Sequence, residues 1–131
     1  MAVERRSPGG RTAAPGYAEI AVTSGRLAFL AGQCPLDGDG ELAGPGDVVA
    51  QTRQVVTNLR ACLDDLGVGP QAVAASTVYV VGDQDALATA WTVFRESGVT
   101  GTPVAPSTLL GVERLGYTGQ LVEVDAVVAL D

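Results

Sequence analysis

The fold is decided by the stretch Phe29-Leu30-Ala31-Gly32-Gln33-Cys34-Pro35-Leu36-Asp37, taken together with two stretches near the C-terminus. These read Ala105-Pro106-Ser107-Thr108-Leu109-Leu110-Gly111-Val112-Glu113-Arg114-Leu115 and Leu121-Val122-Glu123-Val124-Asp125-Ala126. The first and the last stretch are apolar and predict strands, and the first runs into a Gly-Gln turn. Glu123 lies among aliphatic residues. Because an ionised carboxylate is costly to bury, Glu123 either faces water or has a function.

Outward from these stretches, the chain predicts five strands and two helices. Apolar runs bounded by turn residues predict strands at 18–23, 26–33, 73–81, 107–114 and 121–130, the first two joined by a hairpin turn at Ser24-Gly25. Helices are expected at 48–66 and 84–97, with Asp47 and Asp83 as N-caps and Gly67 at the C′ position of the first. Residues 1–12 are rich in charge, Gly and Pro and predict a mobile arm, so that residues 13–131 form one domain.

The first helix is predicted to be amphipathic and to lie on a sheet. Apolar or small residues recur every three or four positions at Val48, Thr52, Val55, Leu59, Cys62 and Leu66. The polar side chains predicted to face away are Gln51, Arg53, Gln54 and Arg60.

The order of elements is ββαβαββ, which predicts an α+β fold with two helices on one face of a single mixed sheet. Two helices cover only one face, whereas the strands are apolar at nearly every position. We therefore expect the bare sheet face to be buried against other copies of the chain.

Composition excludes several kinds of chemistry. The net charge of −7 argues against nucleic-acid binding, which needs a basic surface. The chain has no histidine, and all eight of its cationic residues are arginine. This excludes a lysine Schiff base, a histidine general base, a Ser-His-Asp triad and a histidine-ligated metal. We expect neither a cofactor nor a metal; the turn at 37–40 is explained by turn chemistry better than by calcium.

The two cysteines and the absence of a leader suggest a location. No signal peptide or apolar run of membrane length is present, so we expect a cytoplasmic protein with reduced thiols and no membrane partner. Cys62 is interpreted as a helix core residue. Cys34 is either a small buried hydrophobe or, given a neighbouring cation or helix N-terminus, a reactive thiol.

These motifs resemble the Rid family of reactive intermediate deaminases, also called YjgF-like and endoribonuclease L-PSP. The resemblance runs from Pro15-Gly16-Tyr17 to Ala129 and includes the Gly-Gln-x-Pro turn, a Gln-Thr-Arg-Gln helix and the two C-terminal strands, in the family order. It implies a chorismate-mutase-like topology and a homotrimer, with pockets for small molecules between neighbouring subunits.

The resemblance also implies roles for single residues. Glu123 matches the glutamate that positions a water for attack on a substrate imine; the alternative is an outward-facing glutamate paired with an arginine of the next subunit. Tyr17 either orients a substrate or covers the sheet edge. Trp91 stands where well-known relatives have asparagine, and it either packs in the core or forms an aromatic wall of the pocket. The residues implied to bind substrate are Tyr17, Ala31, Gly32, Gln33, Trp91, Ser107 and Leu109.

Ser107 is the main departure from the family pattern. In relatives, a P-A-R-S motif supplies an arginine that grips the substrate carboxylate, and an ungapped count places Ser107 at that position. A serine offers one neutral donor where arginine offers two charge-assisted hydrogen bonds. Arg114, or Arg26 or Arg11 of a neighbour, remain candidates for a replacement.

Three functions are compatible with these residues. The first is a divergent Rid-family trimer that binds a small metabolite and hydrolyses an imine or enamine with a water held near Glu123, the substrate not being a simple 2-imino acid. The second is a non-catalytic trimeric ligand-binding or accessory protein. The third is another reaction on the same fold, as in chorismate-processing relatives; the lack of cationic residues at the matched positions argues against it.

Overall fold

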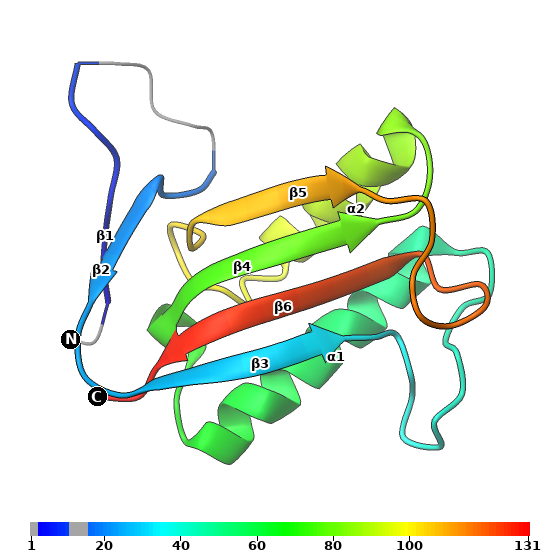
Figure 1. Ribbon diagram of the computed structural model, residues 1–131, viewed down its shortest axis with the longest axis horizontal. Helices are drawn as coiled ribbons and strands as arrows, with labels where there is room; N and C mark the ends of the chain where they lie inside the picture. The colour runs from blue at the N-terminus through cyan, green and yellow to red at the C-terminus, as the bar shows by residue number, and fades with distance from the viewer. Residues whose placement is uncertain (1–2, 11–15) are drawn as a thin grey trace.

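The computed structural model describes residues 3–10 and 16–131 and confirms the α+β class. Its main sheet has four strands in the order β3-β6-β4-β5 (Figure 1). Strands β4 and β5 are parallel, and the other pairs are antiparallel, so the sheet is mixed as predicted. The strands are β3 (Leu27–Gln33), β4 (Val73–Val80), β5 (Ser107–Gly111) and β6 (Val122–Ala129).

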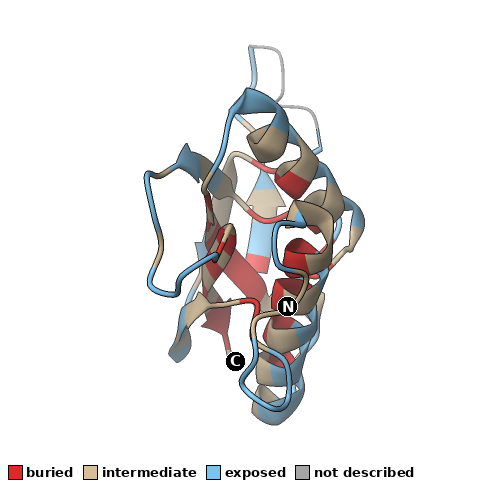
Figure 2. Cartoon of the chain, turned by 90° about the vertical axis from the view of Figure 1, so that its right-hand side faces the viewer, coloured by how far each residue is buried: buried red, intermediate tan, exposed pale blue. Residues whose placement is uncertain are grey.

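Both helices, α1 (Val48–Leu66) and α2 (Gln84–Glu96), lie on the same face of this sheet (Figures 1 and 2). Each begins where the sequence predicted, because the carboxylates of Asp47 and Asp83 accept hydrogen bonds from backbone N–H groups of the first turn. Helix α1 ends at Gly67, which has a φ of 71° in the left-handed region. A short 3-10 turn, η1 (Pro70–Ala72), then leads into β4.

The core lies between the sheet and the two helices (Figure 2). Alternation along β4 and β6 turns every second residue toward the helices. Burial of these aliphatic side chains is the main stabilising term of the fold. Its buried members include Val55, Leu59, Leu63, Val78, Val80, Phe94, Val122, Val124 and Val128.

Gln51 does not face solvent, and its prediction as an outward residue of the first helix is wrong. Its side chain is fully buried, and its amide satisfies three backbone groups. Oε1 accepts from the N–H of Leu121 at 2.8 Å, while Nε2 donates to the carbonyl oxygens of Gly119 at 3.1 Å and Gly44 at 3.3 Å. A buried amide with its hydrogen bonds made is tolerated in a core, and here it fixes the chain just before β6.

The N-terminal segment forms a second, two-stranded sheet. Part of the segment predicted as a mobile arm is strand β1 (Val3–Arg6), which pairs antiparallel with β2 (Ile20–Thr23). Residues 1, 2, 11 and 12 of that arm lie outside the described residues. Val3 is buried, and it packs with Ala74 and Ala129 at one end of the main sheet. This small apolar contact orders a segment whose composition alone suggests mobility.

Arg5 holds β1 against the body of the protein. Its guanidinium donates to the carbonyl oxygens of Val73 and Pro103, each at 2.7 Å, and to that of Pro70 at 3.2 Å. Partial burial lowers the pKa of Arg5. A Cβ on Gly101 would collide with this guanidinium, so glycine is required there. Arg5 thereby joins the N-terminal strand to the loop that precedes β5.

The predicted hairpin between residues 18–23 and 26–33 is wrong. Strand β2 pairs with β1, and β3 pairs with β6 instead. The carboxylate of Asp131 extends the β3–β6 pairing at one end, because it accepts from the backbone N–H of Arg26 at 2.8 Å and from the guanidinium of Arg26 at 2.9 Å.

The face of the main sheet opposite the helices exposes large apolar side chains. Phe29 is 75% exposed, and Leu27 and Leu110 are 41% and 40% exposed. The β1–β2 sheet covers only one end of this face, where it packs Val3 and Ala21. Within the described residues, no helix combines the length and the apolar character needed to cross a membrane.

Candidate functional site

Glu123 lies on β6, on the sheet face opposite the helices, and one of its oxygens is held by two donors. Its neighbours in sequence, Val122 and Val124, are fully buried toward the helices, so alternation places Glu123 on the other face. Oε1 accepts from Nε2 of Gln120 at 3.1 Å and from the thiol of Cys34 at 3.3 Å. The carboxylate is therefore fixed in orientation through a single oxygen.

The second oxygen, Oε2, lies over Gly32 of β3. A Cβ at Gly32 would collide with this oxygen, so glycine is required by the close approach of the side chain. No hydrogen-bond donor to Oε2 is found among the described residues. Strand β3 carries a bulge between Leu30 and Gln33, which inserts a residue opposite Asp125 and brings the Gly-Gln turn beside Glu123.

Gln120 orients the carboxylate and is itself fully paired. It is 3% exposed; its Nε2 also donates to the carbonyl of Val122, and its Oε1 accepts from the N–H of Tyr117. A side chain held by three polar partners has little rotational freedom. Glu123 is consequently positioned before any ligand arrives.

Cys34 donates its S–H to Glu123, and its surroundings disfavour the thiolate. Burial is the main cause that raises the pKa of Cys34, followed by the hydrogen bond to Glu123 and the negative charge of that carboxylate. A reactive cysteine needs the opposite arrangement, with a cation nearby. The geometry therefore favours the interpretation of Cys34 as a small, unreactive residue that also contacts Glu123.

Of the other predicted residues on this edge, Gln33 is bound to its own strand and Ala31 is exposed. The amide of Gln33 donates to the carbonyl of Ala31 at 3.0 Å. Gln33 lies opposite Val124 in the register, so its side chain faces the helices, where it lines a hollow with residues of α1. Ala31 and Gly32 lie on the strand beside Glu123, and we call Ala31, Gly32 and Glu123, with the backbone of Gln33, the Glu123 group.

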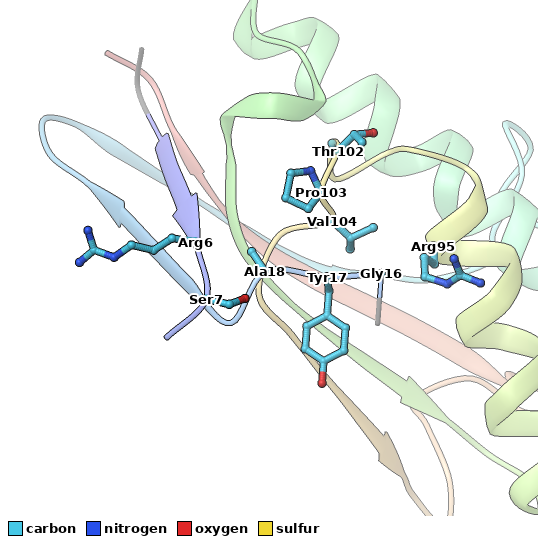
Figure 3. A pocket seen from close by; sticks show the side chains of 10 residues that line it. Arg6, Ser7, Gly16, Tyr17, Ala18, Arg95, Thr102, Pro103 and Val104 are labelled. Atoms are coloured by element: carbon cyan, nitrogen blue, oxygen red, sulfur yellow. The ribbon is translucent and has the colours of Figure 1, made fainter. Parts of the chain in front are cut away.

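Tyr17 and Trp91 lie together at the other edge of the sheet. Tyr17 makes a bridge to Val104 in the segment that leads into β5, and its ring meets Trp91 of α2 edge-to-face with centroids 5.8 Å apart. Trp91 also lies 6.0 Å from Phe94 and packs against the core, which supports its interpretation as a core residue; its role as an aromatic wall of a pocket stays a prediction. Tyr17 lines a cavity of about 590 Å³ (Figure 3), and Glu123 is not among the residues that line it.

Ser107 and Leu109 begin β5 and turn toward the helices. In the parallel register they lie opposite Ser76 and Val78, both buried on the helix side. The hydroxyl of Ser107 lies 2.6 Å from that of Ser76 and donates to the carbonyl of Ala105 at 2.9 Å. The hydroxyl at the position of the family arginine is thus committed to the fold.

The predicted site residues therefore form two groups at opposite edges of one sheet. We call Tyr17, Trp91, Ser107 and Leu109 the Tyr17 group. It lies along β5 and α2, whereas the Glu123 group lies along β3 and β6, and strand β4 separates β6 from β5. By strand alternation, Ser107 and Glu123 point to opposite faces. Within one chain, the structure does not bring the two groups together.

The arginines proposed as replacements are engaged elsewhere or not described. Arg26 forms its ion pair with Asp131, and Arg114 pairs with Glu113 at 2.9 Å beyond the end of β5. Arg11 lies outside the described residues. Among residues 3–10 and 16–131, no three carboxylate or thiol side chains gather as a metal site requires.

Two residues that lie beside the predicted site residues were not singled out in the sequence. Gln120 was not predicted because a glutamine in a loop belongs to no helix or strand pattern. Its position three residues before Glu123 nevertheless allows the two side chains to touch. Arg95 lines the cavity beside Tyr17, and its place one helical turn after Trp91 was the available signal.

Comparison with known proteins agrees with this fold. The family model described as Endoribonuclease L-PSP matches residues 10–130. The crystal structure of YyfB, a Rid family protein of unknown function from Yersinia pestis, superposes with a TM-score of 0.86 at 28% identity, over 99% of this chain and 100% of that one. The fold therefore defines the class: an α+β protein with this strand topology. The chain belongs to the Endoribonuclease L-PSP family, which includes the Rid proteins, as the sequence predicted.

Curated relatives are similar over different lengths. Protein DfrA of Myxococcus xanthus is 35% identical over 108 residues, which cover 82% of this chain and 79% of DfrA. A RutC family protein of Pyrococcus abyssi is 38% identical over 61 residues, 46% of this chain. That match spans about half of the archaeal protein, at 47% of its length.

Proposed function

We propose that the protein is a homotrimer that binds a small metabolite between neighbouring copies and hydrolyses its C=N bond with a water held by Glu123. The water adds to the imine carbon while its proton passes to Oε2. Oε2 returns that proton to the nitrogen, which gives a carbinolamine. The hydroxyl of the carbinolamine then gives up its proton to the nitrogen through the same carboxylate, the C–N bond breaks, and ammonia and a carbonyl group are released. A carboxylate is the base that this chain can offer, because it has neither histidine nor lysine.

The observation that carries this proposal is the asymmetric state of Glu123. Oε1 is occupied by Gln120 and Cys34, whereas Oε2 lies over a glycine with no described donor. An oriented carboxylate with one accepting oxygen is suited to hold a water and take its proton.

Assembly between copies is supported by the placement of the two groups. They lie on opposite edges of the sheet, so a second chain is needed for one ligand to touch both. The exposed Phe29 and Leu27 flank the Glu123 group on β3 and give that edge an apolar surface to bury. A closed ring of three copies satisfies each edge with the opposite edge of the next.

Ser107 restricts the substrate. Its hydroxyl donates its one hydrogen to the carbonyl of Ala105 and accepts from Ser76, and no arginine occupies this place. We expect turnover of 2-iminobutanoate to be weak, because loss of the charged anchor costs about 1.5–3 kcal/mol. The net charge of −7 likewise argues against RNA as the substrate. A cytoplasmic location remains a prediction from the sequence.

The same Ser107 supports a second candidate, a trimeric binding protein without catalysis. A pocket that has lost its anchor for the reacting substrate can keep its affinity for another small molecule. The two candidates differ in whether Glu123 is needed for turnover.

The experiment is a comparison of Glu123→Gln with the unaltered protein on imines generated by an amino-acid oxidase, using a panel that includes imines without a carboxylate. Glutamine keeps the shape and an accepting oxygen but cannot take up a proton. We expect turnover of the best imine to fall about a hundredfold or more, with the oligomer intact. Unchanged turnover would make Glu123 structural, and absence of turnover in both proteins would favour the binding protein.

A further inference from the structure

We propose that Gln51 of helix α1 is a positioning residue for Glu123 and that it acts through Gln120. The proposal rests on the proposed function for the role of Glu123 itself, and it adds a residue from the helix layer on the other side of the sheet. The amide of Gln51 bonds to the backbone on both sides of Gln120, so its effect on the carboxylate is indirect.

The hydrogen bonds of Gln51 leave its own helix. The side chain is 0% exposed, and a buried amide is costly unless its polar atoms are paired. Its Oε1 accepts from the N–H of Leu121 at 2.8 Å, and its Nε2 donates to the carbonyl oxygen of Gly119 at 3.1 Å. These two backbone groups flank residue 120. The backbone of Gln120 is therefore fixed to α1 from both sides.

The side chain of Gln120 extends this connection to the carboxylate. It is 3% exposed; its Oε1 accepts from the N–H of Tyr117 at 3.1 Å, and its Nε2 donates to Oε1 of Glu123 at 3.1 Å. In Figure 1 the loop before β6 and the start of α1 lie at the same end of the molecule. Two buried glutamines thus connect the helix layer to a carboxylate on the opposite face of the sheet.

Asn58 gives α1 a second hold on the surroundings of Glu123. It follows Gln51 by about two helical turns, and its Nδ2 donates to the carbonyl oxygens of Cys34 at 2.8 Å and Leu36 at 3.0 Å. The thiol of Cys34 is the other donor to Oε1 of Glu123. Both donors to this oxygen therefore lie on segments that polar side chains of α1 hold in place.

Thr52 provides a matched control for a purely structural role of Gln51. It is the next residue of α1 and is also 0% exposed, and its hydroxyl donates to the carbonyl oxygen of Val48 at 2.7 Å. This hydrogen bond stays within the helix. Thr52→Val consequently removes a buried hydrogen bond from α1 without touching the loop that carries Gln120.

The first test is hydrogen exchange of the side-chain amide of Gln120, followed by NMR and assigned by the absence of its signal from Gln120→Leu. Gln51→Met keeps the length of the side chain but loses its hydrogen bonds. We expect the Gln120 amide to exchange at least about tenfold faster in this variant, the change that loss of one hydrogen bond produces. Thr52→Val should exchange as the unaltered protein does.

A second variant keeps the test valid if Gln51→Met does not fold. Gln51→Glu retains the acceptor for the N–H of Leu121 and has the size of glutamine, but as a carboxylate it cannot donate to Gly119. We expect the same acceleration of exchange at the Gln120 amide.

The second test measures turnover of the best imine in the oxidase panel. We expect kcat to fall about tenfold in Gln51→Met with KM nearly unchanged, because Gln51 orients the base and does not touch the ligand. Since Gln51 acts through Gln120, the double variant Gln51→Met/Gln120→Leu should be no slower than Gln120→Leu alone. A residue that only stabilises the fold would leave kcat per folded molecule unchanged.

Three results would overturn the proposal. These are exchange of the Gln120 amide unchanged in the Gln51 variants, an equal acceleration in Thr52→Val, or kcat losses that multiply in the double variant. Absence of turnover in the unaltered protein would reject the imine chemistry of the proposed function. The exchange measurement needs no turnover, so it would still decide whether Gln51 orients Gln120.

Discussion

The two edges of the sheet differ in how their charged side chains are held. At the β3–β6 edge, the carboxylate of Glu123 is fixed by Gln120 and Cys34 before any ligand binds. At the β5–α2 edge, Arg95 lines the cavity beside Tyr17, and no hydrogen bond or ion pair joins its side chain to another described residue. The carboxylate at the first edge is therefore held in one orientation, whereas the arginine at the second edge is not.

The proposed function assigns the two edges different parts of a site that is shared between copies. In that proposal one edge supplies the base and the other supplies the aromatic contacts, so neither edge is a complete site alone. Variants that damage one edge and spare the other should therefore have separable effects on assembly, stability and turnover.

Loss of assembly should have the largest effect. Phe29 is 75% exposed on the open face, and Phe29→Asp places a charge where we expect another copy to pack. We expect the mass measured by light scattering to fall from about 40 kDa, three times the 13.3 kDa chain, to that of a monomer. Tyr117→Asp, at a residue 52% exposed in the loop before β6, is the control and should stay trimeric. A monomeric unaltered protein would contradict this.

Arg5→Met should destabilise the edge that carries the cavity. The guanidinium satisfies the carbonyls of Pro70, Val73 and Pro103, and methionine keeps the length of the side chain but none of the bonds. We expect the free energy of unfolding, measured in urea, to fall by about 1.5–3 kcal/mol. Arg6→Met removes only an exposed ion pair with Glu4 and should change stability by less than about 1 kcal/mol. Equal effects of the two variants would refute the role given to Arg5.

Gln120→Leu should disturb the orientation of Glu123. Leucine fills a similar volume but cannot donate to Oε1, so the carboxylate regains rotational freedom. We expect kcat to fall about tenfold with KM nearly unchanged, because the residue positions the base and does not touch the ligand. Cys34→Ala removes the weaker donor and should have a smaller effect on kcat. A rise in KM alone would place Gln120 in ligand binding instead.

The thiol of Cys34 should give the smallest change. Burial and Glu123 raise its pKa, so less thiolate is present at a given pH than for free cysteine. In a Cys62→Ala background, alkylation by iodoacetamide should reach half its maximal rate at a higher pH than for free cysteine, scanned from about pH 7 to 10. Glu123→Gln should move this midpoint down, because it removes the carboxylate's charge and leaves the burial. A midpoint that is the same with and without Glu123→Gln would show that the carboxylate of Glu123 does not raise the pKa of Cys34.

Much of the fold was predictable because it rests on local signals. The caps at Asp47 and Asp83, the aliphatic stripe of α1 and the alternation of β6 each depend on nearby residues. The pairing of β3 with β6 was not predictable, since it joins residues about 100 positions apart, as in the contact between Arg26 and Asp131 at a separation of 105. The burial of Gln51 was hidden for the same reason, because its partners lie in the loop before β6.

The candidate site divides in the same way. Glu123 and Gly32 were found from motifs, and their contact follows from the antiparallel register of β3 and β6. The positions of the Gln120 and Arg95 side chains depend on the three-dimensional structure, and no sequence motif predicts them. That Ser107 faces the helices could not be read from the sequence, because the start of β5 fixes which face each residue takes.

A subunit-mixing experiment tests most directly whether the two edges meet between copies. Glu123→Gln and Tyr17→Ala are each purified, then unfolded together in equal amounts and refolded. If each site takes Glu123 from one chain and Tyr17 from the next, one site in every mixed trimer is intact, and about a quarter of the unaltered activity should return. If both residues serve a site within one chain, no intact site can form, and a mixture no more active than the two variants measured apart would contradict a site shared between copies.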